Sequence, residues 1–137
     1  MNRHLVLLSI AQGLFLTNNV TFIAINGCPD AVADAQVGKR TLVVRLGATR
    51  AAWLYLAVAL LAHAWLMGGV WLFIQPEPAL WGLASLPLSL VAFVLLRKHA
   101  DEPTRLAPAI VLTIAAAVLH GLAMSAGLAS LSLFGSL

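Results

Sequence analysis

Residues 26–47 read NGCPDAVADAQVGKRTLVVRLG and hold much of the polar chemistry of an otherwise apolar chain. The stretch contains two of the five carboxylates, Asp30 and Asp34, together with the basic side chains of Lys39, Arg40 and Arg45. Long apolar runs lie on both sides of it. Charge concentrated in one loop of an apolar protein is typical of an orientation signal in a membrane, of a polar site, or of both.

The composition of the chain predicts a membrane protein. Of 137 residues, 61% are hydrophobic and 9% are charged, and the mean hydropathy is +0.96. A soluble domain carries roughly a quarter charged residues. The net charge of +3 does not indicate nucleic-acid binding, because the basic residues lie in short loops between apolar runs. Cys28 is the single cysteine, so the chain forms no intrachain disulfide.

Four apolar runs predict an all-α integral membrane protein with four transmembrane helices. The runs span residues 5–25, 51–74, 79–96 and 107–134. A helix needs about 20 apolar residues to cross the hydrocarbon of a bilayer. None of the runs alternates as the strands of a membrane β-barrel do. Pro87 lies in the middle of the third run, so we expect a kink there.

The loops between the runs predict how the chain is oriented. Residues 38–50 carry four basic side chains and residues 97–105 carry three, whereas residues 75–78 carry none. The positive-inside rule therefore places the first and third loops in the cytoplasm. We expect a multi-pass protein of the inner, cytoplasmic membrane of a bacterial cell. The N-terminus then lies outside, although Arg3 and His4 favour the inside.

Asp30 and Asp34 lie four residues apart, a spacing that aligns side chains on one face of a helix. Pro29 suits the first turn of such a helix and Gly38 suits its end, so residues 29–37 predict a short helix at the membrane surface. Two aligned carboxylates repel each other unless a cation lies between them, and Mg²⁺ takes carboxylate and phosphate oxygens. The spacing therefore indicates a metal–diphosphate site. Exposed ion pairs between loop acids and loop bases are the simpler alternative.

The segment PDAVADAQVGKRTLVVRLG, residues 29–47, resembles the second aspartate-rich motif of the UbiA family of membrane prenyltransferases. The shared pattern is D-x-x-x-D, a short spacer, G-K-R-T-L and V-R-L-G. Three apolar runs follow the motif here, as they do in the family. The resemblance implies that residues 28–137 are a UbiA-like C-terminal portion with a partial UbiA-like helical bundle. The nearest resemblance is to members that prenylate 1,4-dihydroxy-2-naphthoate or 4-hydroxybenzoate in menaquinone and ubiquinone synthesis.

The resemblance also implies partners and site residues. The implied partners are a polyprenyl diphosphate, an aromatic acceptor, Mg²⁺ and the lipid bilayer. By matching position, Asp30 and Asp34 hold Mg²⁺, while Lys39 and Arg40 are the catalytic pair that neutralises the departing diphosphate. The residues implied in binding the diphosphate are Asn26, Lys39, Arg40 and Arg45.

The chain departs from the family in its N-terminal part. It contains no N-D-x-x-D motif, which is the first aspartate-rich motif of the family, and it has fewer apolar runs than family members. Residues 1–27 instead resemble the first helix of a major facilitator superfamily transporter. Such a helix starts inside the cell, which would explain Arg3. We therefore expect a fusion or truncated product that is joined near Gly27 or Cys28.

Three functional interpretations stay open at this point. The first is a UbiA-like prenyltransferase fragment that is incomplete without an N-terminal half. The second is a non-catalytic membrane protein, either a transporter fragment or a structural four-helix subunit. The third is a homodimer in which two copies of Asp30 and Asp34 rebuild a site of four carboxylates.

Polar residues inside the apolar runs are a second set of candidates. His63 and His120 are ionisable groups in membrane segments, which makes them functional candidates. Each stands without an acid or a second His at ligand spacing, so we expect each to hydrogen-bond a neighbouring helix. Ser85, Ser89 and Thr113 are expected to bond back to their own helices. The small residues expected to form a packing face in the fourth run are Gly121, Ala123, Ser125, Gly127 and Ala129.

Overall fold

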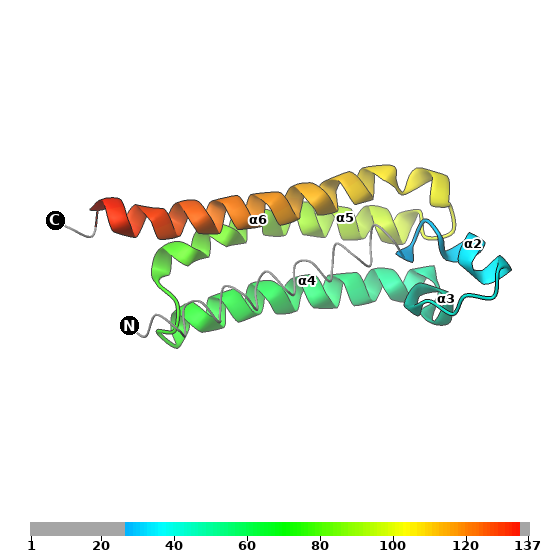
Figure 1. The fold of residues 1–137 in the computed structure, drawn as a ribbon, viewed down its shortest axis with the longest axis horizontal. Helices are drawn as coiled ribbons and strands as arrows, with labels where there is room; N and C mark the ends of the chain where they lie inside the picture. The colour runs from blue at the N-terminus through cyan, green and yellow to red at the C-terminus, as the bar shows by residue number, and fades with distance from the viewer. Residues whose placement is uncertain (1–26, 135–137) are drawn as a thin grey trace.

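The computed structural model describes residues 27–134, and within that range every regular element is helical. The elements are α2 (Ala31–Gln36), α3 (Leu42–Leu46), α4 (Ala48–Trp71), the 3-10 helix η2 (Glu77–Ser85), α5 (Leu86–Lys98), the 3-10 helix η3 (Pro103–Arg105) and α6 (Ala107–Phe134). Three stretches are long and apolar enough to cross a membrane: α4, η2 together with α5, and α6. They run side by side (Figure 1). Three of the four predicted spans are thus confirmed as helices, and the first, residues 5–25, lies outside the described residues.

The limits of α4 are set by backbone geometry at both ends. The helix begins at Ala48 because Gly47, with φ of 78°, adopts a left-handed conformation that separates it from α3. It ends at Trp71, where the chain turns back and the N–H of Gln75 donates to the carbonyl of Gly69 at 3.0 Å. The buried Gln75 side chain lies against Gly69, where a Cβ would come within 3.1 Å of its Cδ and make a tight contact. The span is therefore shifted by a few residues from the predicted run 51–74.

The third span changes helix type at its middle. It begins as η2 and continues as α5 from Leu86, so the whole span is Glu77–Lys98 rather than 79–96. Pro87 is the second residue of α5. Proline is tolerated in the first turn of an α-helix, because it fixes a helical φ and lacks an N–H that would have no partner. The helix type changes from 3-10 to α next to Pro87, and the kink expected there stays a prediction.

One stripe of α6 faces η2 and α5. Its buried members recur every three or four residues, as one face of a helix requires. They are Ala109, Thr113, Ala116, His120, Met124 and Gly127. The prediction that Gly121, Ser125 and Ala129 form the packing face was wrong, because Ser125 and Ala129 are exposed. Gly127 is the small residue that matters: a Cβ there would overlap the carbonyl oxygen of Pro78 in η2.

The two basic loops lie at the same end of the helical bundle (Figure 1). α2 and α3 stand beside the turn that joins α5 to α6, and the two parts line a common groove. At this end Trp53 of α4 meets Phe93 of α5, with ring centroids 5.0 Å apart. The guanidinium of Arg97 lies 5.3 Å above the Trp53 ring. The contacts among Trp53, Phe93 and Arg97 suit a membrane–water boundary, where aromatic rings and cations are frequent.

Candidate functional site

The acidic loop folds as its local sequence predicts. α2 covers Ala31–Gln36, with Asp30 at its N-cap position and Val37 at its C-cap position. Gly38 follows with φ of 75°, the left-handed conformation that glycine adopts at little cost after a helix. The short helix expected over residues 29–37 is therefore confirmed, with its regular part slightly shorter.

The structure places Asp34 one turn beyond Asp30. The N–H of Asp34 donates to the carbonyl of Asp30 at 2.8 Å. Asp30 is exposed, and its side chain caps no backbone N–H of α2. The Asp34 side chain is only 13% exposed, and its Oδ1 accepts from Nζ of Lys39 at 3.1 Å. The backbone N–H of Lys39 also donates to the carbonyl of Asp34, so the chain after Gly38 folds back over this carboxylate.

The other basic side chains of the loop stand apart from the acids. Thr41 caps α3, because its Oγ1 accepts from the N–H of Val44 at 3.4 Å. Arg40 precedes this cap and Arg45 lies in the last turn of α3, and both are exposed. Neither arginine forms an ion pair with a carboxylate of the described residues. Asn26, the remaining predicted site residue, lies outside the described part of the chain.

A groove of about 550 Å³ runs beside α2, between α3 and the turn that precedes α6. Its lining is mainly apolar and includes Cys28, Val32, Val43 and Pro103. Asp101, from the second basic loop, also lines it. Asp30 and Asp34 are not among the described residues that line the groove, and Asp101 is the one charged residue that is. The mainly apolar lining suits an apolar chain.

The donor groups of the loop can be compared with what a metal ion requires. Mg²⁺ is usually held by one or two carboxylates plus substrate phosphates and water, so a pair of acids suffices only when a phosphate completes the site. In residues 27–134 no group of three His, Cys, Asp or Glu side chains is placed to hold a metal by itself. The donor set of Asp30 and Asp34 with Lys39 beside them therefore fits a metal–diphosphate unit better than a free metal ion.

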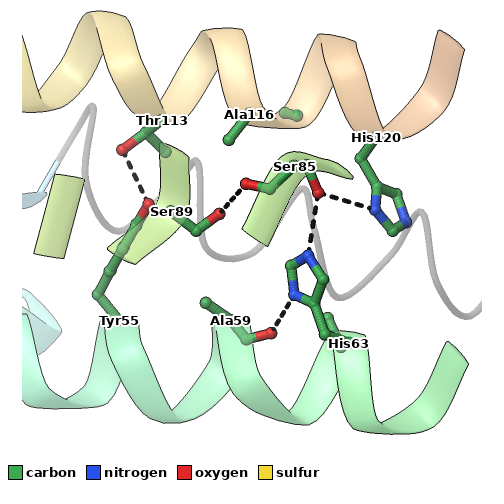
Figure 2. Close-up of a pocket in the computed structure, with 10 residues that line it drawn as sticks. Tyr55, Ala59, His63, Ser85, Ser89, Thr113, Ala116 and His120 are labelled. Atoms are coloured by element: carbon green, nitrogen blue, oxygen red, sulfur yellow. Dashed lines mark hydrogen bonds between the residues drawn. The ribbon is translucent and has the colours of Figure 1, made fainter. Parts of the chain in front are cut away.

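A second polar cluster, which the sequence alone did not reveal, lies in the middle of the three long helices (Figure 2). Nε2 of His63 lies 3.0 Å from Oγ of Ser85, and Nδ1 of His120 lies 3.2 Å from the same oxygen. The two imidazole rings meet edge to face, with centroids 5.6 Å apart. The expectation that each histidine stands alone was therefore wrong, although the expected bonds to neighbouring helices are present.

The sequence does contain a signal for this cluster. His63, Ser85 and His120 lie at similar distances along the chain from the ends of their helices. His63 lies about 15 residues after the start of α4, and His120 about 13 residues after the start of α6, which corresponds to roughly 20 Å of helix in each case. Ser85 lies at a similar distance before the end of α5. The three depths are counted from the same, basic end of the bundle. Because the loops at that end are short, residues at equal depth in neighbouring helices are expected to lie close together.

Three further hydroxyl groups continue the cluster toward the basic end (Figure 2). Oγ of Ser89 donates to the carbonyl of Ser85 at 3.4 Å, as expected for a serine that bonds back to its own helix. Thr113 likewise bonds to the carbonyl of Ala109, at 2.8 Å. Its Oγ1 also lies 3.1 Å from the hydroxyl of the buried Tyr55. The prediction for Ser89 and Thr113 is confirmed, but Thr113 additionally joins α6 to α4.

Comparison with models of protein families, with curated proteins and with solved structures found no match to this chain.

Proposed function

We propose that this chain supplies the second acidic loop of a UbiA-type membrane prenyltransferase, which binds a polyprenyl diphosphate with Mg²⁺. One observation carries the proposal. Asp30 and Asp34 lie at the start of α2 and one turn further along, and Lys39, just after α2, pairs with Asp34. That helix stands at the end of three apolar helices, next to an apolar groove. A diphosphate with an isoprenoid tail needs both features, a charged site at the surface and an apolar surface leading from it.

The reaction implied by the sequence resemblance is the alkylation of an aromatic ring. The bond between the allylic carbon and the diphosphate oxygen breaks, the diphosphate leaves with the electron pair, and the ring carbon bonds to the allylic carbon and then loses its proton. Mg²⁺, when bound, would neutralise the diphosphate. Asp30 and Asp34 would hold it, and Lys39 and Arg40 would add fixed positive charge where the leaving group develops negative charge. Arg45, in the last turn of the next short helix α3, would bind the same anion.

By the resemblance, transfer to an acceptor also requires the first aspartate-rich motif of the family, N-D-x-x-D, which this sequence does not contain. We propose that another polypeptide segment or a second copy of the chain provides it. The acceptor class that follows from the resemblance is a hydroxylated aromatic acid of quinone synthesis. The chain by itself is proposed to bind the diphosphate but not to transfer the prenyl group.

Binding of geranylgeranyl diphosphate to the full chain in lipid nanodiscs tests the proposal. We expect calorimetry to give an affinity that falls at least about tenfold when Mg²⁺ is removed with EDTA, a loss of about 1.4 kcal/mol. The double variant Asp30→Asn, Asp34→Asn should lose the Mg²⁺ dependence. Lys39→Gln should weaken binding in the presence of Mg²⁺ as well, because it removes a charge that contacts the anion rather than the metal.

Glu77→Gln is the matched control, because Glu77 is an exposed carboxylate at the opposite end of the bundle. Its affinity should equal that of the wild type. Binding that ignores Mg²⁺ and both aspartates would overturn the proposal.

A non-catalytic role is the second candidate, and the pairing of Asp34 with Lys39 favours it. In that case the two charges form an ion pair at the C-terminal end of α2, in which Lys39 is mainly exposed and Asp34 mainly covered, and it has no role in binding a ligand. The chain would then bind no diphosphate under any condition. It would instead form a stable complex with another membrane protein. The same calorimetric experiment separates the two functions.

A further inference from the structure

From the geometry around Ser85 we infer a proton-binding site in the middle of the helical bundle. Nε2 of His63 is the acceptor, and the Ser85 hydroxyl is its switchable partner (Figure 2). The site lies about 15 residues, roughly 22 Å of helix, beyond the start of α4, so it is separate from the acidic loop. The inference does not depend on the proposed prenyltransferase function.

The hydrogen bonds of the neutral cluster have one consistent direction. Nδ1 of His63 lies 2.7 Å from the carbonyl oxygen of Ala59, and since a carbonyl only accepts, Nδ1 carries the proton. Nδ1 of His120 donates in the same way to the carbonyl of Gly82, at 3.0 Å. Nε2 of His63 is then a bare acceptor, and the Ser85 hydroxyl donates to it at 3.0 Å. Both ring nitrogens of His63 and the Ser85 hydroxyl have a partner in this arrangement.

The same atoms accommodate one additional proton without leaving a group unpaired. When Nε2 of His63 gains a proton it becomes a donor, and Oγ of Ser85 is already within hydrogen-bonding distance to accept. The Ser85 hydroxyl then turns to the carbonyl of Gly82, which lies 2.9 Å from Oγ. Both N–H groups of the His63 imidazolium are hydrogen-bonded in this state. Ser85 thus acts as a rotor between two acceptors that serve two protonation states.

The cluster should bind a single proton, and His63 should carry it. Within the described residues, no hydrogen bond reaches Nε2 of His120, so a proton there would lack an acceptor. A second imidazolium is disfavoured because two positive charges at this separation repel strongly in an apolar interior. On the elements packed around His63, the other titratable groups that face the cluster are His120 on α6 and Tyr55 on α4. η2 and α5 contribute only serines.

The size of the cavity argues for a proton rather than a larger ligand. The cavity lined by these residues has a volume of about 20 Å³. That is enough for one water molecule and far below the several hundred Å³ of sites for organic ligands. A metal ion held by protein alone needs more donors than two imidazoles, and the described residues offer no group of three such side chains.

Nitrogen NMR of the full chain, labelled with ¹⁵N-histidine in lipid bilayers, tests the inference. The signals of His63 are identified by their loss in His63→Gln. We expect Nδ1 of His63 to be protonated throughout, and Nε2 to change from bare to protonated as the pH is lowered through the range in which the protein stays folded. His120 should keep one protonated nitrogen over the same range.

Two variants distinguish a proton site from a merely structural network. Ser85→Ala removes the group that accepts from protonated Nε2 of His63, so Nε2 should gain its proton only at a lower pH than in the wild type, while Nδ1, which bonds to the carbonyl of Ala59, stays protonated. Ser85→Thr keeps a hydroxyl and should restore the wild-type signals. Ser89→Ala is the matched control, because the Ser89 hydroxyl donates to a backbone carbonyl and does not contact either imidazole.

Three results would overturn the inference. They are an Nε2 of His63 that stays bare at the lowest pH, a joint protonation of both imidazoles, and a Ser85→Ala variant identical to the wild type. The variant Asp30→Asn, Asp34→Asn should titrate as the wild type does, so a failure of the diphosphate site leaves this test unaffected.

Discussion

Cys28 lies in the apolar groove beside α2, with 6% of its surface exposed. Burial raises the pKa of its thiol above the ordinary value of 9.0, because the thiolate is poorly solvated there. The thiolate is the nucleophile in alkylation, so we expect iodoacetamide to modify the folded protein at least about tenfold more slowly than the detergent-unfolded chain. Mass spectrometry of timed reactions at one mildly alkaline pH measures the two rates.

The same burial gives stability a pH dependence of known sign. The unfolded chain ionises this thiol at a lower pH than the folded chain does, so the contribution of Cys28 to the free energy of unfolding falls as the pH rises past 9.0. Cys28→Ser should lack that contribution, and the difference between wild type and variant isolates it from the other groups that titrate there. Equal slopes for both proteins, or fast alkylation of the folded chain, would contradict the assignment of Cys28 to a buried position.

At the residue scale, local features were predictable and tertiary ones were not. Gly38 ends α2 because its left-handed φ and the preceding helical pattern are both encoded within a few residues. The meeting of His63 with His120 depends on how three helices pack, which no local pattern encodes. Likewise, the sequence placed Asp34 near Lys39 but gave no reason for the two to pair at 3.1 Å.

At the scale of elements, the contact between α6 and η2 depends on one glycine. A Cβ at Gly127 would overlap the carbonyl oxygen of Pro78, and this atom belongs to the backbone and cannot rotate away. Gly127→Ala should therefore push α6 from η2 and cost about 1–3 kcal/mol of stability, as overpacking does. Thermal unfolding in detergent, followed by circular dichroism, should give a lower midpoint for the variant.

Gly121→Ala is the control for this prediction, since nothing lies within 4 Å of a Cβ at that position. Both variants make the same change in the same helix. Gly121→Ala should leave the midpoint unchanged or raise it, because alanine favours a helix over glycine by up to about 1 kcal/mol. Equal effects of the two variants would show that α6 does not approach η2 as closely as the structure has it.

The lengths of the apolar runs predicted that long helices exist. They did not predict the residues at which these helices begin and end. Apolar runs indicate what can lie in hydrocarbon, whereas helix ends are set by turns such as the one that returns Gln75 to Gly69. The row of small residues in α6 was misassigned because several residue spacings in that helix fit a packing face. The choice among them depends on which face η2 meets, and this is a tertiary property.

At the scale of the whole molecule, both basic loops and the acidic helix gather at one end (Figure 1). The loop charges predict this arrangement, because the positive-inside rule places loops that are two spans apart on the same side. The sequence does not predict the groove between them, since its walls come from α2, from α3 and from the turn before α6. The loop charges thus predict a position of the acidic helix at a membrane surface, and the packing of the elements places that helix beside an apolar groove.

Labelling of single cysteines tests this arrangement in intact bacterial cells. In a Cys28→Ser background, Gln36→Cys and Thr104→Cys place thiols at exposed positions of the two basic loops, and Glu77→Cys places one at the opposite end. A membrane-impermeant maleimide added outside should label Glu77→Cys at least about tenfold faster than the other two, because the positive-inside rule puts their loops in the cytoplasm. Permeabilised cells should label all three, which controls for reactivity. Labelling of Gln36→Cys and Thr104→Cys from opposite sides would contradict the fold, whereas labelling of both from outside would reverse its orientation and place the acidic loop away from cytoplasmic diphosphates.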